Sequence, residues 1–147
     1  MNNLKCYVLI VSKSFPATHP KAGIDTNFIL KINADLKKHT IHKNYEYWKN
    51  RIDNVKAGKA YLSIRFWSGL PRKSEQIETC KLYSNDGVDV SKVLFDGKGW
   101  LVNDLVVDTR TLAKNDGLEL NDFNDWFKEP VINKAYALIH FNNYKYV

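Results

Sequence analysis

Residues Leu36–Gly69 read LKKHTIHKNYEYWKNRIDNVKAGKAYLSIRFWSG, and this stretch contains the passage from helix to strand around which the remaining chain is organised. Apolar side chains recur in it at the three- and four-residue spacing of one helix face: Tyr45, Trp48, Ile52 and Val55. Asn44 is a favourable N-cap, and Gly58 stands where a left-handed C-terminal residue is common, so we expect an amphipathic helix between them. Residues 60–67, AYLSIRFW, then alternate between two faces, which predicts a half-buried strand.

The polar face of this strand ends in a guanidinium beside an indole, from Arg65 and Trp67. Such a pair is either a simple surface stack or part of a site that holds a nucleobase or its phosphate. The loop at 68–74, SGLPRKS, follows directly. Its Arg72, Lys73 and Ser74 could contact phosphate or could form a solvated basic turn.

Turn residues divide the rest of the chain into short segments. We expect strands at residues 5–11, 76–83, 88–95, 100–107 and 135–141. We expect helices near 28–36, at 109–115, and from about 121 to a stop before Pro130. Short strands with turn signals every eight to twelve residues favour a small barrel over a parallel sheet. The predicted fold is therefore α+β, with about six strands in a small mixed barrel flanked by helices, in one domain of residues 1–147.

The composition is that of a globular protein, with 44% hydrophobic and 26% charged residues. No apolar run approaches the roughly 18 residues of a membrane span, and the first residues lack a signal-peptide cleavage site. Cys6 and Cys80 lie in strand-like settings without the spacing of metal ligands. We therefore expect a cytoplasmic protein with free thiols and no membrane partner.

The net charge of +6 is spread unevenly along the chain. Residues 1–81 carry 15 Lys and Arg against 6 Asp and Glu, whereas residues 82–147 carry 7 against 10. The basic part indicates either a polyanionic or phosphorylated partner, such as RNA, or simply a basic surface. Neither charge nor composition predicts whether the chain is a monomer or a dimer.

Three imidazoles and one carboxylate could form a metal site: His39, His42, His140 and Glu46. They show no HExxH or comparable ligand spacing, and two histidines three apart in a short strand would face opposite sides. The phosphate-binding patterns GxxxxGK[ST] and GxGxxG are also absent. We therefore predict no metal and no cofactor.

The pair Lys37 and Thr40 is the more specific chemical arrangement. A threonine hydroxyl becomes a nucleophile when a neighbouring base takes its proton, and a desolvated lysine can be that base. A carboxylate elsewhere would then orient the lysine or move protons. Because residues three apart point to opposite faces of an ideal strand, the pair works only if Lys37 lies in the bend between helix and strand.

The first helix, the segment Lys37-Lys38-His39-Thr40-Ile41 and the GKAYLSIRFWSG strand resemble the ASCH family over most of the chain. The resemblance implies a PUA-like barrel. In small bacterial members that hydrolyse N4-acetylcytidine, a Lys-x-x-Thr pair precedes a strand and a later carboxylate completes a triad. Lys37 and Thr40 match that spacing, and Asp116 falls near the family's glutamate, with a side chain one methylene shorter.

One residue departs from the family pattern, and two stretches are similar to a particular subgroup. His42 stands where relatives usually have an arginine, which the family implies is a contact to substrate or phosphate. Residues 44–48 and the SGLPRKS loop are similar to a subgroup from bacteria and their phages or mobile elements, whose role is not established.

Three functions follow from the residues and the resemblance. The first is the binding of RNA or a modified nucleoside in a basic, aromatic cleft lined by His39, His42, Tyr45, Arg65 and Trp67, with Arg72, Lys73 and Ser74 nearby. The second is an amidohydrolase that removes an acyl group from N4-acylated cytidine, with Thr40 as nucleophile, Lys37 as base and Asp116 assisting proton transfer. The third is an unrelated structural protein or toxin–antitoxin partner, which would neither bind a nucleoside nor contain a pocket.

Overall fold

The computed structural model describes residues 3–147, which contain eight strands and four α-helices. The elements are β1 (Lys5–Ile10), α1 (Phe28–Asn33), β2 (His39–His42), α2 (Tyr45–Lys56), β3 (Ala60–Trp67), β4 (Gln76–Leu82), the short 3-10 turn η1 (Ser84–Asp86), β5 (Asp89–Phe95), β6 (Trp100–Val102), β7 (Leu105–Val107), α3 (Thr109–Asn115), α4 (Leu120–Trp126) and β8 (Tyr136–His140). This is an α+β architecture, as predicted. Among these described helices, none has both the length and the apolar character needed to cross a bilayer.

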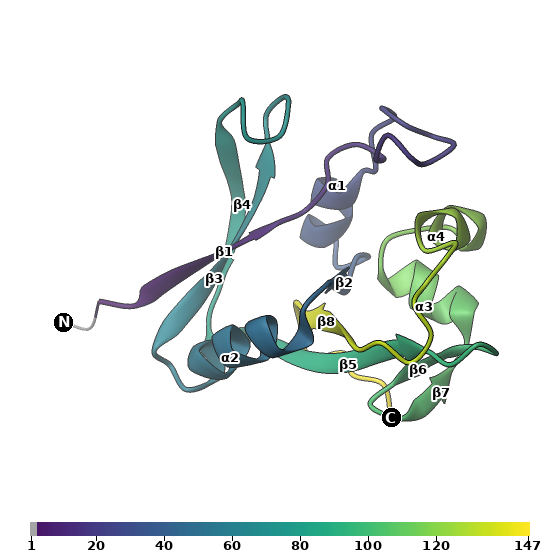
Figure 1. Cartoon of the computed structure of the whole chain (residues 1–147). Helices are drawn as coiled ribbons and strands as arrows, with labels where there is room; N and C mark the ends of the chain where they lie inside the picture. Colours follow the sequence, from purple (N-terminus) through teal and green to yellow (C-terminus); the bar gives the residue numbers. More distant parts are fainter. Residues whose placement is uncertain (1–2) are drawn as a thin grey trace.

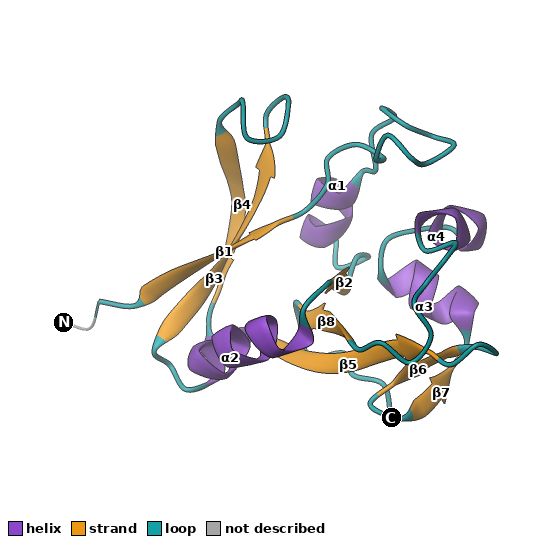
Figure 2. Ribbon diagram, in the orientation of Figure 1, coloured by secondary structure: helices purple, strands orange, loops and turns teal. Residues whose placement is uncertain are grey.

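The strands form two sheets, which Figure 1 shows as separate layers with α2 lying where they approach each other. The first sheet has the order β1-β3-β4, in which β1 runs parallel to β3 and β4 runs antiparallel to it. The second has the order β2-β8-β5-β6-β7 and is antiparallel throughout. In Figure 2 the helices α1, α3 and α4 gather on one side of this second sheet.

The predicted barrel of about six strands is not formed as a closed structure. Within residues 3–147 no strand pairing joins the two sheets. The segment between the predicted strands at 76–83 and 88–95 forms a tight turn, with Gly87 at φ 90°, but this turn does not close a hairpin. It instead carries the chain from β4 in the first sheet to β5 in the second, so two strands adjacent in sequence are not adjacent in space.

Two apolar clusters hold the layers together. The first unites the β1–β3 sheet, α2 and one end of the second sheet, and the other unites α1, α3 and α4 with the remainder of that sheet. Strand β8 contributes to both, because its alternate residues face opposite sides. Ala137 and Ile139 belong to the first cluster, whereas Tyr136 and Leu138 belong to the second. Strand β2, which pairs with β8, therefore lies at the junction of the two clusters.

Several predicted helix ends are confirmed by their capping contacts. The Asn44 side chain accepts a hydrogen bond from the Tyr47 amide at 3.2 Å at the start of α2, and Gly58 adopts φ 75° beyond its end. The first helix is shorter than predicted. It ends at Asn33, so Leu36 lies outside it with 57% of its surface exposed.

The connection from α1 to β2 is fixed by backbone hydrogen bonds to distant elements. The Lys37 amide donates to the Lys31 carbonyl, and the Lys38 amide donates to the Asn115 carbonyl at the end of α3. The Phe141 amide in turn donates to the Lys38 carbonyl. These contacts hold Lys37 outside the strand, beside α3.

Candidate functional site

Four of the predicted residues meet around one cavity of about 130 Å³, namely Lys37, Thr40, His42 and Asp116. The remaining lining comes from Ile10, Val11, Ser12, Phe28, Ile41, Trp126 and Phe127. Thr40 and His42 are two residues apart in β2 and therefore share a face. Lys37 lies in the bend before β2. The Lys-Thr pair was expected to work only with Lys37 in this position.

Lys37 is almost fully buried, with 1% of its surface exposed. Its Nζ donates to the backbone carbonyl of Asp116 at 2.6 Å and lies 3.4 Å from Asp116 Oδ1. The same ammonium lies 4.0 Å from the centroid of the Phe28 ring. Burial lowers the pKa of Lys37 and the Asp116 carboxylate partly opposes that shift. A buried lysine of this kind loses its proton more readily than a surface lysine, as a general base must.

Asp116 is presented by the C-terminal end of α3. The next residue, Gly117, has φ 85°, and a Cβ atom there would lie only 3.2 Å from Lys37 Cβ. Glycine therefore permits both the left-handed turn and the close approach of this turn to the lysine side chain. The Asp116 side chain is buried beside that lysine as a result.

His39 lies behind the cavity instead of lining it. Its ring is completely buried, with Nδ1 3.1 Å from Asp116 Oδ1 and Nε2 2.7 Å from the Tyr146 hydroxyl. The Asn115 side-chain amide donates to the same hydroxyl at 3.2 Å. Burial lowers the pKa of His39, which favours the neutral ring. The structure therefore surrounds His39 with protein groups, although the sequence suggested a contact to substrate.

His42 lies at the opening of the cavity. Burial and the nearby charge of Lys37 lower the pKa of His42 to about 4, so its ring is neutral at pH 7. The ring lies 5.5 Å from that of Trp48. A neutral imidazole offers one donor and one acceptor, and it lacks the positive charge that an arginine would bring to this position.

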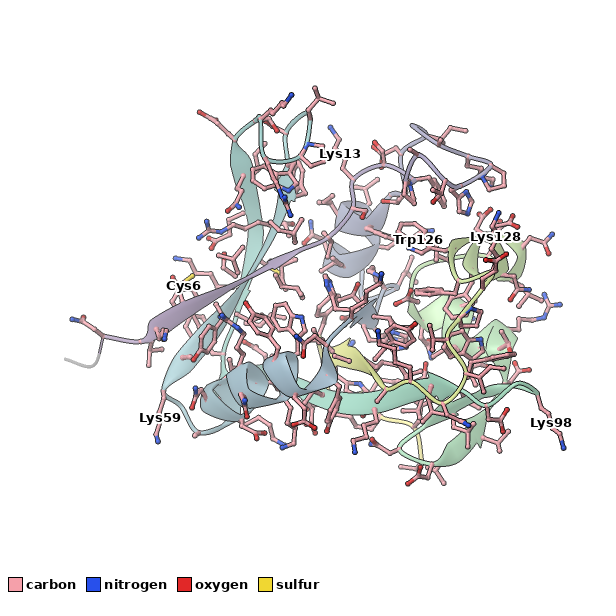
Figure 3. All side chains as sticks on the ribbon, viewed as in Figure 1. Cys6, Lys13, Lys59, Lys98, Trp126 and Lys128 are labelled. Carbon is pink, nitrogen blue, oxygen red and sulfur yellow. The ribbon has the colours of Figure 1, made fainter. Side chains whose placement is uncertain are left out.

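A wider cleft of about 510 Å³ adjoins the cavity. The two share the residues Ile41, His42, Trp126 and Phe127. The cleft is completed by Thr18, Lys43, Asp125, Lys128, Glu129, Pro130, Val131 and Tyr136. Figure 3 labels Trp126 between α1 and α4, with Lys128 farther out. The cleft has aromatic walls. Its two lysines and two carboxylates balance each other in charge.

The other predicted binding residues line neither the cavity nor the cleft. Arg65 is held within the first sheet, where it donates to Ser63 Oγ at 2.9 Å and to Gln76 Oε1 at 3.1 Å. Trp67 ends β3, and the turn at 68–75 that follows carries Arg72, Lys73 and Ser74. Tyr45 lies at the start of α2 with the Lys92 ammonium 5.2 Å from its ring.

Their distance from the cavity has a structural reason. Alternation along 60–67 predicts which residues share a face, but it does not predict which sheet carries the strand. Burial alternates only over residues 60–62, because Ser63 is also buried and the pairing with β4 shifts between Ile64 and Arg65. The Ser74 hydroxyl also has a local partner, because it accepts from the Gly69 amide at 2.9 Å and donates to the Leu70 carbonyl at 2.8 Å.

Several residues that line the cavity or the cleft, or that bond His39 behind the cavity, were not predicted from the sequence: Phe28, Trp126, Phe127, Tyr136 and Tyr146. The spacing of Trp126 and Phe127 near Phe123 is typical of a core-facing helix side, and Phe123 is indeed fully buried. The available signal was the pair of large aromatics just before Pro130, where a helix must end. Nothing near Tyr146 in sequence connects it to residue 39.

Within the described part of the chain, no three His, Cys, Asp or Glu residues are grouped as they would be around a metal ion. Of the residues considered for such a site, His140 is bonded to Ser91 Oγ at 2.8 Å and His39 to Asp116.

Comparison of the chain with family models, with curated proteins and with solved structures found no significant match. The resemblance to the ASCH family therefore rests on the residues quoted above, and the cavity must be interpreted from its own geometry.

Proposed function

We propose that this protein hydrolyses a short N-acyl amide, with Thr40 as the nucleophile and Lys37 as the general base. One observation carries the proposal. Lys37 and Thr40 were paired from their spacing, and Asp116 was implied by the ASCH resemblance. All three line the same 130 Å³ cavity, although Asp116 comes from a distant helix end. A buried lysine with a lowered pKa, which lines the same cavity as a hydroxyl, matches the requirements for activating a weak nucleophile.

The first half of the reaction forms an ester on the protein. Lys37 is paired with Asp116 as an ammonium in the free protein, and its lowered pKa lets it lose that proton before the reaction begins. The Thr40 hydroxyl then gives its proton to the neutral Lys37 amine while its oxygen attacks the acyl carbonyl carbon. The C–N bond then breaks as the Lys37 ammonium returns the proton to the departing amine nitrogen. Lys37 is bonded to Asp116 in the free protein, so its flexible stem must bring Nζ to Thr40 before this transfer.

The second half releases the acid. A water molecule loses a proton to Lys37 and attacks the ester carbonyl carbon. The bond between that carbon and the Thr40 oxygen then breaks, and the Lys37 ammonium returns the proton to this oxygen, which restores the free hydroxyl and the neutral amine. Asp116 accepts a hydrogen bond from the ammonium that forms in each half, which lowers the energy of that charge in a buried site.

The sizes of the two spaces indicate the class of substrate. The inner cavity is well below the roughly 300–1,000 Å³ of ordinary ligand sites, so it suits an acyl group alone. The outer cleft of 510 Å³ falls within that range and has aromatic walls, which suit a flat amine. N4-acetylcytidine combines both features, and the ASCH resemblance, with its PUA-like barrel, favours the same choice.

Incubation with N4-acetylcytidine, with release of cytidine and acetate followed by chromatography, tests the proposal. Thr40→Ala should reduce turnover at least 1,000-fold because the nucleophile is lost, and Thr40→Ser should retain part of it. Ser91→Ala removes another buried hydroxyl, away from the cavity, and should keep activity. Absence of release by the wild-type protein, across a panel of acylated nucleosides, would contradict hydrolysis.

A second candidate is the binding of RNA or a modified nucleoside without chemistry, and the aromatic lining of the cleft favours it. Base stacking on an aromatic side chain contributes roughly 1–3 kcal/mol. In a Thr40→Ala background, Trp126→Ala should therefore weaken binding of N4-acetylcytidine about 5- to 150-fold in calorimetric titration. Trp67→Ala, outside the cleft, is the matched control, and an equal loss from both would exclude the cleft as the binding place.

A further inference from the structure

A chain of hydrogen bonds runs behind the cavity and ends on the catalytic carboxylate of the proposed mechanism. It joins Asn115 Nδ2 to the Tyr146 hydroxyl, that hydroxyl to His39 Nε2, and His39 Nδ1 to Asp116 Oδ1. The distances are 3.2, 2.7 and 3.1 Å. Tyr146 reaches this position from the segment after β8, far in sequence from the α1–β2 connection.

The donors and acceptors fix a direction along the chain. An amide NH2 can only donate, so Asn115 donates to the tyrosine oxygen. The tyrosine proton is then free for the bare Nε2 of a neutral imidazole, and the ring proton resides on Nδ1, where Asp116 accepts it. A charged imidazole would instead present a second donor to the tyrosine oxygen and would leave the tyrosine proton without this acceptor.

We propose that His39 and Tyr146 are positioning residues for the Asp116 carboxylate. Tyr146 holds His39 as the neutral Nδ1–H tautomer, and His39 Nδ1–H donates a hydrogen bond to Asp116 Oδ1, which orients the carboxylate toward Lys37. The catalytic meaning of this arrangement rests on the proposed function, whereas the hydrogen-bond chain itself does not.

The groups around His39 agree with a neutral ring. Asp116 and the Tyr146 hydroxyl contact its two nitrogens, and the His140 ring lies edge-on at 6.2 Å. The Lys37 ammonium lies 3.4 Å from the same Asp116 oxygen that His39 contacts. Asp116 is the carboxylate in contact with the ring, and its charge is already shared with Lys37. His39 is also completely buried, so a proton on it would gain nothing from water.

Ring-nitrogen NMR of the substrate-free protein at pH 7 tests the chain directly. The expected spectrum shows His39 with a protonated Nδ1 and a bare Nε2 whose signal is displaced by the tyrosine hydrogen bond. Tyr146→Phe should move the Nε2 signal to the position of an unbonded ring nitrogen. Tyr144→Phe is the matched control, because Tyr144 packs edge-on against Tyr146 at 5.3 Å without joining the chain. An Nε2–H tautomer, a charged ring, or an unmoved signal in Tyr146→Phe would overturn the proposal.

The kinetics of deacylation test the positioning role. His39→Leu removes a hydrogen-bond donor to the Asp116 carboxylate, so kcat should fall about tenfold while KM changes little. His39→Asn places an amide donor where Nδ1 was and should restore most of the wild-type kcat. Equal kcat values for the leucine and asparagine variants would overturn this role.

The two proposals fail separately. An inactive wild-type protein with the Nδ1–H tautomer contradicts the hydrolysis and leaves the chain intact. An active protein with the Nε2–H tautomer contradicts the chain and leaves the hydrolysis intact.

Discussion

A lysine as buried as Lys37 is rare in a folded protein unless its charge is paired. Here its partners are the Asp116 carboxylate and carbonyl and the face of the Phe28 ring. Burial nevertheless lowers the pKa of Lys37, which means that removing the charged ammonium from water reduces the free energy of unfolding. A group with a perturbed pKa at a cavity is more often functional than one on the surface, and this is the physical basis for assigning it the role of base.

Lys37→Met tests whether Lys37 and Asp116 are both charged in the folded protein. Methionine fills a similar volume but leaves the buried carboxylate of Asp116 without its cation, so we expect a loss of about 3 kcal/mol in the free energy of unfolding. Adding Asp116→Asn removes the unpaired charge and should recover most of that loss. Urea denaturation at pH 7 measures both. A single variant at least as stable as the double variant would contradict a charged pair.

Single residues were predictable where the chemistry is local. Lys37 and Thr40 could be paired from their spacing and from the bend between them. Asp116 entered only through the family resemblance, because nothing local connects residue 37 with the end of α3. Tyr146 had no signal at all, since its contact with His39 exists only once the segment after β8 has folded back.

At the scale of elements, local rules predicted most boundaries. The predicted strand at 60–67 and the predicted helix at 109–115 coincide with β3 and α3. The first turn of α3 is capped by the Asp108 side chain, which accepts a hydrogen bond from the Thr111 amide at 3.0 Å. Asn103 and Asp104 have φ of 49° and 68° and divide the predicted strand at 100–107 into β6 and β7. Partners of the strands were not predictable, because pairing depends on contacts far apart in sequence.

The turn between β4 and β5 supports the segment that delivers Tyr146, and Gly87 offers a test of that support. A Cβ atom at Gly87 would lie 2.7 Å from the backbone carbon of Asn142, whereas one at Gly58 would meet nothing within 4 Å. Both glycines have positive φ, so Gly58→Ala should cost only the conformational strain of about 1–2 kcal/mol. Gly87→Ala should cost more and should also displace the His39 Nε2 signal. Equal stability losses in thermal unfolding, with an undisturbed His39, would show that the two segments are not coupled.

For the whole molecule, the site lies where two separately built layers meet. Ile10 and Val11 reach the cavity from the end of β1, Thr40 and His42 from β2, and Trp126 and Phe127 from the end of α4. The α+β class followed from the order of the elements. The division into two sheets did not, because it depends on β1 pairing in parallel with β3 across 49 intervening residues, from Val11 to Lys59. A cavity at such a junction cannot be located from periodicity, which describes each element alone.

The same junction buries imidazoles, and their titration should dominate the response of the whole fold to mild acid. Burial is the main cause that lowers the pKa of His42 to about 4 and that of His140 to about 3. An unfolded histidine binds a proton near pH 6.5, so below that pH the unfolded state takes up protons that the folded state refuses. Stability is therefore fully present above pH 6.5 and falls as the pH drops toward 4.

Each of these two histidines should contribute a slope of about 1.4 kcal/mol per pH unit near pH 5. Urea unfolding at intervals between pH 6.5 and 5 measures this slope before most carboxyl groups titrate. His42→Asn should reduce the total slope by the contribution of one histidine, because asparagine takes up no proton in the unfolded state. This reduction is expected whatever the variant does to stability at pH 7. A slope that is unchanged in the variant would mean that His42 is charged in the folded protein. In that case the opening of the cavity would be cationic, and a phosphate-bearing ligand would become a better match for the cleft than a neutral nucleoside.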